Sequence, residues 1–138
     1  MIEEIYVSFD TARMLKEAGF DVPCRGVYVT DRTGYYEFRE YDNKQTTDDL
    51  CWNTEDGFYY EYLAPTQALA ARWLREVHHI NVYACFDYEE FDEKKWFFTR
   101  EHTMVTDDSA VYCDVINYDS YEEALEAGLK HGLELIKK

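Results

Sequence analysis

The clearest hydrophobic pattern in the chain lies in residues 65–86, where a helical period gives way to strand-like alternation. The first half carries large apolar residues at i, i+4 and i+8, namely Leu69, Trp73 and Val77. This spacing predicts one amphipathic helix, with Ala70 and Leu74 beside the stripe. In the second half, apolar and polar residues alternate, which predicts a buried strand. The residues expected on its inner side are Ile80, Val82, Ala84 and Phe86.

A second helix is predicted close to the N-terminus, over residues 9–18. Ser8 precedes it and is a favourable N-cap residue. Gly19 follows it at the C′ position, where the backbone commonly adopts a left-handed conformation. Phe20 comes next and fits the apolar contact of a Schellman ending.

The third predicted helix ends the sequence. Ser120 and Glu123 are spaced as a capping box, and apolar residues recur along one side of the segment that follows. Those residues are Leu125, Leu129, Leu133 and Ile136. Gly128 and Gly132 lie one turn apart, although glycine costs about 1 kcal/mol inside a helix. We interpret them as positions where the helix approaches a sheet closely.

Short runs of β-branched and aromatic residues predict the strands, at 27–30, 35–41, 58–63, 80–86, 96–104 and 110–116. Between two of them, residues 42–57 hold few apolar groups, and we expect a mobile loop anchored by Cys51 and Trp52. Short connections between strands favour antiparallel pairing. The sequence therefore predicts a single α+β domain over residues 1–138, with two layers. A mainly antiparallel sheet forms one layer, and about three helices pack on one of its faces.

The same patterns predict which side chains form the hydrophobic core. They come from the central helix and strand, from the last strand and from the C-terminal helix. The expected core consists of Leu69, Trp73, Leu74, Val77, Val82, Ala84, Phe86, Val115, Leu125 and Leu129.

Composition narrows the possible functions. The formal net charge is −15, and a field of this sign repels nucleic-acid phosphates, so direct DNA or RNA binding is not expected. No apolar run approaches the roughly 20 residues that span a bilayer. The acidic start, MIEEIYVSFD, is unlike a signal peptide. We therefore expect a cytoplasmic protein that does not interact with membranes.

The sequence gives little support for catalysis or for a bound cofactor. Its four cysteines are widely spaced without a CxxC pair, and His78-His79 belongs to no HxxxH or HExxH motif. A cation at a helix C-terminus has a structural reason in the helix dipole. Cysteine–histidine pairing of Cys85 or Cys113 with His102 is a minor alternative.

Other motifs for metal or phosphate binding are also missing from the sequence. The acidic runs at 87–93 and 107–108 lack the spacing of a calcium loop and are typical of solvated turns. No glycine-rich phosphate loop or GxSxG is present. We expect no cofactor and no structural metal, and we do not favour an enzyme.

The unusual feature is the aromatic content, with 13 tyrosines among 138 residues. Alternation along the strands places some of them away from the helices, and tyrosine suits interfaces because it combines apolar area with a hydroxyl. The alternative is that tyrosine is simply a good strand residue. The candidate residues for ligand or partner binding are Trp52, Tyr59, Tyr60, Tyr62, Tyr83 and Tyr88. An exposed tyrosine-rich face also predicts a homodimer.

Three segments carry a resemblance. APTQALAARWLREVHHINVYA in the centre, YVSFDTARMLKEAGFDVPC near the start and YDSYEEALEAGLKHGLELI near the end resemble small uncharacterised proteins of bacteriophages, prophages and mobile elements of gut Bacteroidetes. The resemblance covers nearly the whole chain, and no catalytic motif comes with it. It implies an accessory protein that acts in the cytoplasm of a bacterial host.

Two hypotheses about function follow. In the first, the chain is a non-enzymatic protein that binds a host protein, for example a basic or nucleic-acid-binding one. In the second, it binds a small molecule, or is a minor enzyme, with an aromatic pocket between the sheet and residues 42–57. A continuous acidic stripe would favour the first hypothesis, and a closed aromatic pocket with convergent polar groups would favour the second.

Overall fold

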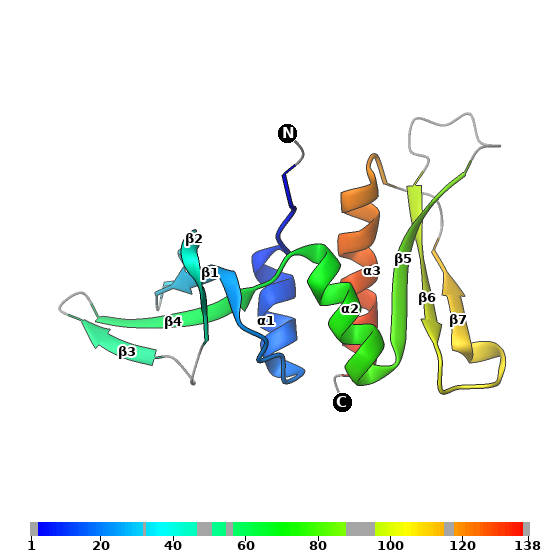
Figure 1. Ribbon diagram of the computed structural model, residues 1–138, viewed down its shortest axis with the longest axis horizontal. Helices are drawn as coiled ribbons and strands as arrows, with labels where there is room; N and C mark the ends of the chain where they lie inside the picture. Colours follow the sequence, from blue (N-terminus) through cyan, green and yellow to red (C-terminus); the bar gives the residue numbers. More distant parts are fainter. Residues whose placement is uncertain are drawn as a thin grey trace. The chain divides into compact units, whose positions relative to one another are not determined.

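The computed structural model describes residues 3–31, 33–46, 51–54, 57–87, 96–114 and 118–136, with the backbone alone described for 51–54 and 57–59. These residues form three α-helices and two antiparallel sheets, with helices packed against strands (Figure 1). The predicted α+β class is confirmed. The chain divides into two compact units, Met1–Thr66 and Gln67–Lys138.

The first unit is a four-stranded antiparallel sheet with one helix. The strand order is β2-β1-β4-β3, so that β1 lies between β2 and β4. The strands are β1 (Cys24–Thr30), β2 (Tyr36–Gln45), β3 (Cys51–Thr54) and β4 (Gly57–Ala64). The helix, α1 (Phe9–Glu17), contacts β4. An isolated bridge between Tyr6 and Thr66 joins the segment before α1 to the end of this unit.

Both ends of α1 follow the prediction. The Ser8 hydroxyl accepts a hydrogen bond from a backbone N–H of the first turn. At the other end, Gly19 has φ +96° and donates its N–H to Lys16 O at 3.1 Å. Phe20 donates its N–H to Leu15 O at 2.9 Å, and both side chains are buried. These two bonds are the paired hydrogen bonds of a Schellman motif, so the predicted glycine and the apolar residue after it are confirmed.

The structure differs from the prediction over residues 42–57. β2 continues as far as Gln45, and Cys51–Thr54 form β3, which pairs with the start of β4. Backbone pairing with neighbouring strands makes this polar stretch extended, which a count of apolar side chains does not reveal. Residues 47–50 and 55–56 lie outside the described part, and mobility stays a prediction.

The second unit places two helices against a three-stranded antiparallel sheet of order β5-β6-β7. Its elements are α2 (Gln67–His78), β5 (Ile80–Phe86), β6 (Trp96–His102), β7 (Val111–Cys113) and α3 (Tyr121–Ile136). Both helices contact β5 and lie on the same side of this sheet (Figure 1). The sequence predicted one sheet, whereas the strands divide between two. Hydrophobic alternation identifies a strand but not the sheet to which it belongs.

The inner side of β5 is as expected, because Ile80 and Val82 are buried and Ala84 and Phe86 are partly buried. On α2, Trp73 and Leu74 are buried as predicted, while Val77 is 51% exposed and the prediction for it is wrong. The buried side of α2 includes Gln67 and Ala70 instead. Leu69 is partly buried, Leu125 and Leu129 are buried, and Val115 lies outside the described residues.

α3 begins and packs as predicted. The Glu123 N–H donates to Ser120 Oγ at 3.1 Å, and the Glu123 carboxylate accepts from the Asp119 N–H at 3.0 Å. A Cβ added at Gly128 would lie 2.5 Å from Val82 Cγ1, and one at Gly132 would lie 3.3 Å from Ile80 Cγ2. The prediction that these glycines allow close approach to the sheet is confirmed.

The turn between α2 and β5 depends on a left-handed residue that is not glycine. His79 has φ +60°, and its carbonyl accepts the Thr103 N–H at 2.8 Å and the Thr103 hydroxyl at 3.1 Å. Each non-glycine residue in this conformation is strained.

We expect His79→Val to lower the free energy of unfolding by about 1–2 kcal/mol, because a β-branched side chain is disfavoured at positive φ. His79→Gly should keep or raise stability. Urea denaturation of both variants beside the wild type measures the difference. Equal stability of the two variants would contradict the left-handed backbone at this position.

Candidate functional site

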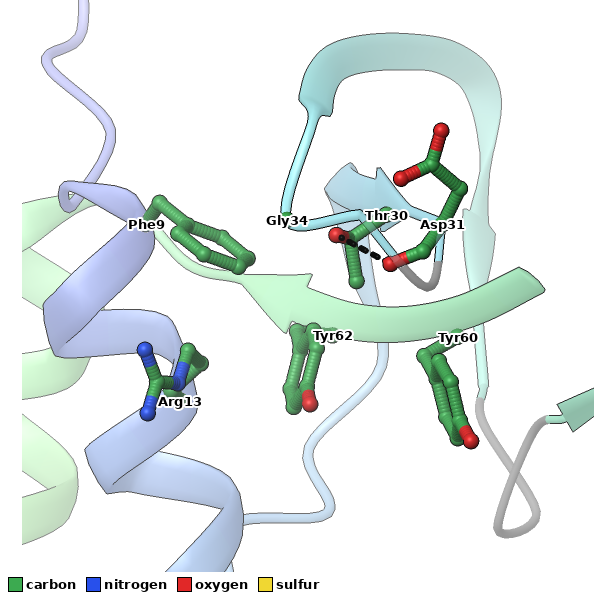
Figure 2. A pocket seen from close by; sticks show the side chains of 7 residues that line it. All are labelled: Phe9, Arg13, Thr30, Asp31, Gly34, Tyr60 and Tyr62. Carbon is green, nitrogen blue, oxygen red and sulfur yellow. Dashed lines mark hydrogen bonds between the residues drawn. The ribbon is translucent and has the colours of Figure 1, made fainter. Parts of the chain in front are cut away.

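A surface hollow in the first unit brings together several aromatic side chains. It has a volume of about 430 Å³ and collects residues from α1, β1, the turn after β1 and β4 (Figure 2). We call it the aromatic hollow; its lining residues are Phe9, Arg13, Thr30, Asp31, Gly34, Tyr60 and Tyr62.

Strand register explains why these aromatic residues meet. In the backbone ladder, Thr30 lies opposite both Tyr36 and Tyr60. Two residues back along β1, Tyr28 lies opposite Phe38 and Tyr62. Because side chains two apart in a strand share a face, all three strands place aromatic residues on one face of this sheet. Figure 2 shows Tyr60 and Tyr62 extending from the same side of β4.

Phe9, the first residue of α1, connects the helix to this aromatic face. Its ring stacks on Tyr36, with centroids 4.3 Å apart and planes 11° apart. It meets the rings of Tyr28 and Tyr62 edge-on, at 5.6 and 5.7 Å. Offset-stacked and edge-on geometries are the favourable ones for aromatic pairs, so these contacts hold the rings in defined positions.

Cations from α1 lie over two of the rings. Arg13 Cζ is 5.7 Å from the centre of the Phe9 ring, and Lys16 Nζ is 5.0 Å from the centre of the Tyr62 ring. Such distances fall within the range of cation–π attraction. Arg13 also lies 3.9 Å from the Asp10 carboxylate, in an exposed pair that contributes little to stability. The hollow is therefore aromatic, with positive charge along the α1 side.

Asp31 forms the opposite rim. Its carboxylate accepts the Thr33 hydroxyl at 2.6 Å and the Thr33 N–H at 2.8 Å. These bonds, the hydroxyl first, hold the pKa of the Asp31 carboxyl below its usual value. Figure 2 shows this carboxylate and the rings of Tyr60 and Tyr62 pointing in opposite directions. Gly34, at φ +93°, allows the turn that positions the rim.

Of the six predicted binding residues, the structure brings Tyr60 and Tyr62 together in this hollow. Trp52 and Tyr59 are backbone partners across β3 and β4, and their side chains lie outside the described part. Tyr83 belongs to the second unit, where its hydroxyl donates to Glu101 at 2.6 Å. That bond, together with burial, raises the pKa of Tyr83 to about 12. Tyr88 lies outside the described residues.

The sequence did not identify Phe9, Arg13 or Asp31 as site residues. Asp31 falls between the strands predicted at 27–30 and 35–41, and the other two belong to the helix predicted over 9–18. One usable signal was Phe9 itself, a large aromatic residue directly after an N-cap. An amphipathic helix seldom needs an aromatic residue there for its own stability, so its contact is expected to be tertiary.

The cysteine–histidine alternative is not supported by the register of the second unit. Cys85 lies opposite Phe97, and His102 lies opposite Ile80 at the other end of the same hairpin. The two thiols instead contact one hydroxyl, Thr99 Oγ1, which lies 3.4 Å from Cys85 Sγ and 3.6 Å from Cys113 Sγ. Neither sulfur has an imidazole base in these contacts. The register does not support the Cys113–His102 alternative either, because Cys113 lies opposite Thr99, three residues before His102.

Cys24, in the first unit, is buried, and its thiol donates to Val22 O at 3.1 Å. Burial raises the pKa of the Cys24 thiol to about 11, so the thiol stays protonated at neutral pH. Within the described residues, no three His, Cys, Asp or Glu side chains gather as a metal site. The expectation of a metal-free protein remains to be measured.

The chain matches no protein-family model, no curated protein and no solved structure. In the part of the chain that the structure describes, no helix is long and apolar enough to cross a membrane.

Proposed function

We propose that the chain is a non-enzymatic binding protein whose aromatic hollow holds part of a basic protein partner. The observation that carries the proposal is the exposure of the aromatic residues around the hollow. Tyr36 is 50% exposed and Tyr60 is 39% exposed, and Phe38 on the same face is also exposed. Clustered exposed aromatic residues are typical of protein interfaces, where they supply much of the binding energy.

Charge supports a basic partner. The chain carries a formal charge of −15, which attracts positively charged proteins over distances comparable to the Debye length. At contact distance, the exposed tyrosine faces attract cationic side chains. Arg13 and Lys16 already occupy the α1 side, so the partner's cations are expected over Tyr36 and Tyr60.

The biological setting in the proposal rests on the sequence resemblance alone. On that reading, the protein is an accessory factor of a bacteriophage or mobile element, and the partner is a host protein in the bacterial cytoplasm. Binding to such a partner requires no cofactor, no direct nucleic-acid contact and no membrane.

Site-specific photocrosslinking tests this function. A benzoylphenylalanine placed at position 60 should crosslink to one basic protein in cells of a bacterial host, and the adduct can be identified by mass spectrometry. The same probe at Tyr121, a comparably exposed tyrosine at the start of α3, should give no such adduct. Equal crosslinking at both positions would contradict a partner seated on the hollow.

The affinity for the purified partner provides a second test. Tyr60→Ala should weaken binding by roughly tenfold or more, as expected for an aromatic residue at an interface. Affinity should also fall as salt is raised from 0.05 to 0.3 M, because screening shortens the reach of the charges. An affinity that rises with salt would contradict a basic partner.

The predicted homodimer is an alternative use of the same aromatic face. Sedimentation at tens of micromolar protein distinguishes the two. A dimer that Tyr60→Ala dissociates would assign the face to a second copy of the chain, and a monomer leaves it to another protein.

A small-molecule function remains the second candidate. One specific observation favours it, a cavity in the second unit that contains a buried arginine. It differs in position from the aromatic pocket that the sequence predicted beside residues 42–57.

A further inference from the structure

A cavity at one end of the second unit combines apolar walls with basic side chains. Its volume is about 570 Å³, which is within the range of small-molecule sites. We call it the arginine cavity; its lining residues include His78, Ile80, Arg100, His102, Val105 and Leu135. Leu135 is 42% exposed, so the cavity reaches the surface beside the last turn of α3.

Arg100 is the feature that requires an explanation. It lies on the central strand of the sheet and is only 8% exposed. Its Nη1 donates to Ser109 O at 2.9 Å and to Ala110 O at 3.4 Å, and its Cζ lies 5.9 Å from the centre of the Tyr112 ring. No ion pair to Arg100 is found among the described residues. A buried guanidinium without a carboxylate is costly, because its charge is only partly compensated.

The guanidinium also has an unused donor. Arg100 Nε is shielded from solvent and has no hydrogen-bond partner within the described part of the chain. Nη1 donates to the two backbone carbonyls, so the edge of the guanidinium formed by Nε and Nη2 stays available for a ligand. That edge has the spacing to bind both oxygens of a carboxylate.

Two histidines add polar groups to the same cavity. His78 Nε2 is likewise buried without a partner in the described residues. His102 Nδ1 accepts the Met104 N–H at 3.4 Å, so a neutral His102 carries its proton on Nε2 and can donate it. These polar side chains come from two elements, His78 from α2 and Arg100 and His102 from β6.

Two acidic side chains that lie near cavity residues in the sequence have other partners. Glu101 accepts from Tyr83, and Asp107 accepts from the Ser109 N–H at 2.9 Å. The cavity also lies at the C-terminal ends of α2 and α3, whose partial negative charge offsets part of the arginine's charge. Selectivity must then come from direct hydrogen bonds rather than from a strong positive field. One full positive charge matches a monoanion better than a phosphate dianion.

We propose that the arginine cavity binds a small organic monocarboxylate with an apolar body. The carboxylate pairs with the free edge of Arg100 and accepts from His102 Nε2, while the apolar body contacts Ile80, Val105 and Leu135. This binding is separate from the protein interface proposed for the first unit, and neither depends on the other.

A matched ligand pair tests the proposal on the full chain. Titration of the wild-type protein with 3-phenylpropionate, followed by calorimetry, should give saturable binding. The neutral isostere 3-phenylpropionamide should bind at least about tenfold more weakly, since it lacks the charge. Equal affinity for the two, or no saturable binding of the carboxylate up to about 10 mM, would refute the proposal. Inorganic phosphate that displaces the ligand with higher affinity would also refute it.

Substitutions in the chain test whether the carboxylate binds at Arg100. Arg100→Gln should weaken carboxylate binding by about tenfold to a hundredfold. Arg72→Gln, which removes an equal charge from the exposed side of α2, should change the affinity less than about twofold. Equal loss in both variants would mean a nonspecific charge effect and would overturn the assignment.

Because Arg100→Gln could impair folding, Leu135→Trp gives an independent test. The larger side chain starts from an exposed position and fills the cavity without removing a buried group. It should abolish carboxylate binding while the circular dichroism spectrum stays native. Wild-type affinity in Leu135→Trp would place the ligand elsewhere and overturn the proposal.

Discussion

Trp73→Ala is expected to lower the free energy of unfolding by about 3–5 kcal/mol, the usual cost of truncating a buried tryptophan. Trp73 is 6% exposed in the second unit, and its ring lies edge-on to His78 with centroids 4.8 Å apart. Its removal leaves a void that rigid neighbours cannot fill, so transfer and cavity terms add. Chemical denaturation followed by circular dichroism measures the loss.

Val77→Ala is the matched control, one turn further along the same helix. Val77 is exposed, and alanine has the higher helix propensity, so stability should change by less than about 0.5 kcal/mol. A loss below about 1 kcal/mol for Trp73→Ala, or a comparable loss for both variants, would contradict the orientation of α2.

Gly128→Ala is expected to destabilise the second unit by about 1–3 kcal/mol, although alanine is the better helix former by about 1 kcal/mol. The added methyl would lie 2.5 Å from Val82 Cγ1 and 3.1 Å from Phe98 Cβ. Val82 and Phe98 are themselves buried, so neither can move aside without disturbing the core. Thermal and urea denaturation report the loss.

Gly132→Ala serves as the comparison, one turn along α3. There the nearest atoms would be 3.3–3.4 Å from the new Cβ, so a small shift is enough. We expect stability within about 1 kcal/mol of the wild type, because the gain in helix propensity offsets the crowding. If Gly128→Ala were the more stable variant, α3 could not approach β5 as closely as described.

The sequence predicted helix ends well because their chemistry is local. Ser8, Gly19 and Ser120 act within a few residues of themselves, so their roles can be recognised without knowing the fold. The buried side of α2 was predicted less well. Gln67 is buried because its amide donates to Glu122 O and to Glu126 Oε1, both at 2.9 Å. These partners are more than fifty residues away in sequence, and the hydropathy of glutamine gives no sign of them.

The two sites also combine features that the sequence predicts with features that only the structure shows. Alternation along 35–41 and 58–63 predicted aromatic residues on the side away from the helices, whereas Tyr36 and Tyr62 contact Phe9 of α1. It also did not indicate that register aligns Tyr36, Thr30 and Tyr60 across three strands. The side of β6 on which Arg100 lies could be predicted from the sequence. Trp96, Phe98 and Arg100 are two residues apart from one another and so share one face of the strand, the face toward the helices. That Arg100 Nε has no hydrogen-bond partner among the described residues could be seen only in the structure.

The buried thiol of Cys24 has a practical consequence for how opening of the first unit can be followed. A thiol with a pKa of about 11, sealed in β1, reacts with alkylating reagents only when its surroundings open. Cys113, exposed on β7, reacts without any opening and calibrates the intrinsic rate. The ratio of the two labelling rates, read by mass spectrometry after proteolysis, then gives the opening free energy of the first unit under native conditions. This measurement needs no denaturant and can be made while a partner or ligand is bound.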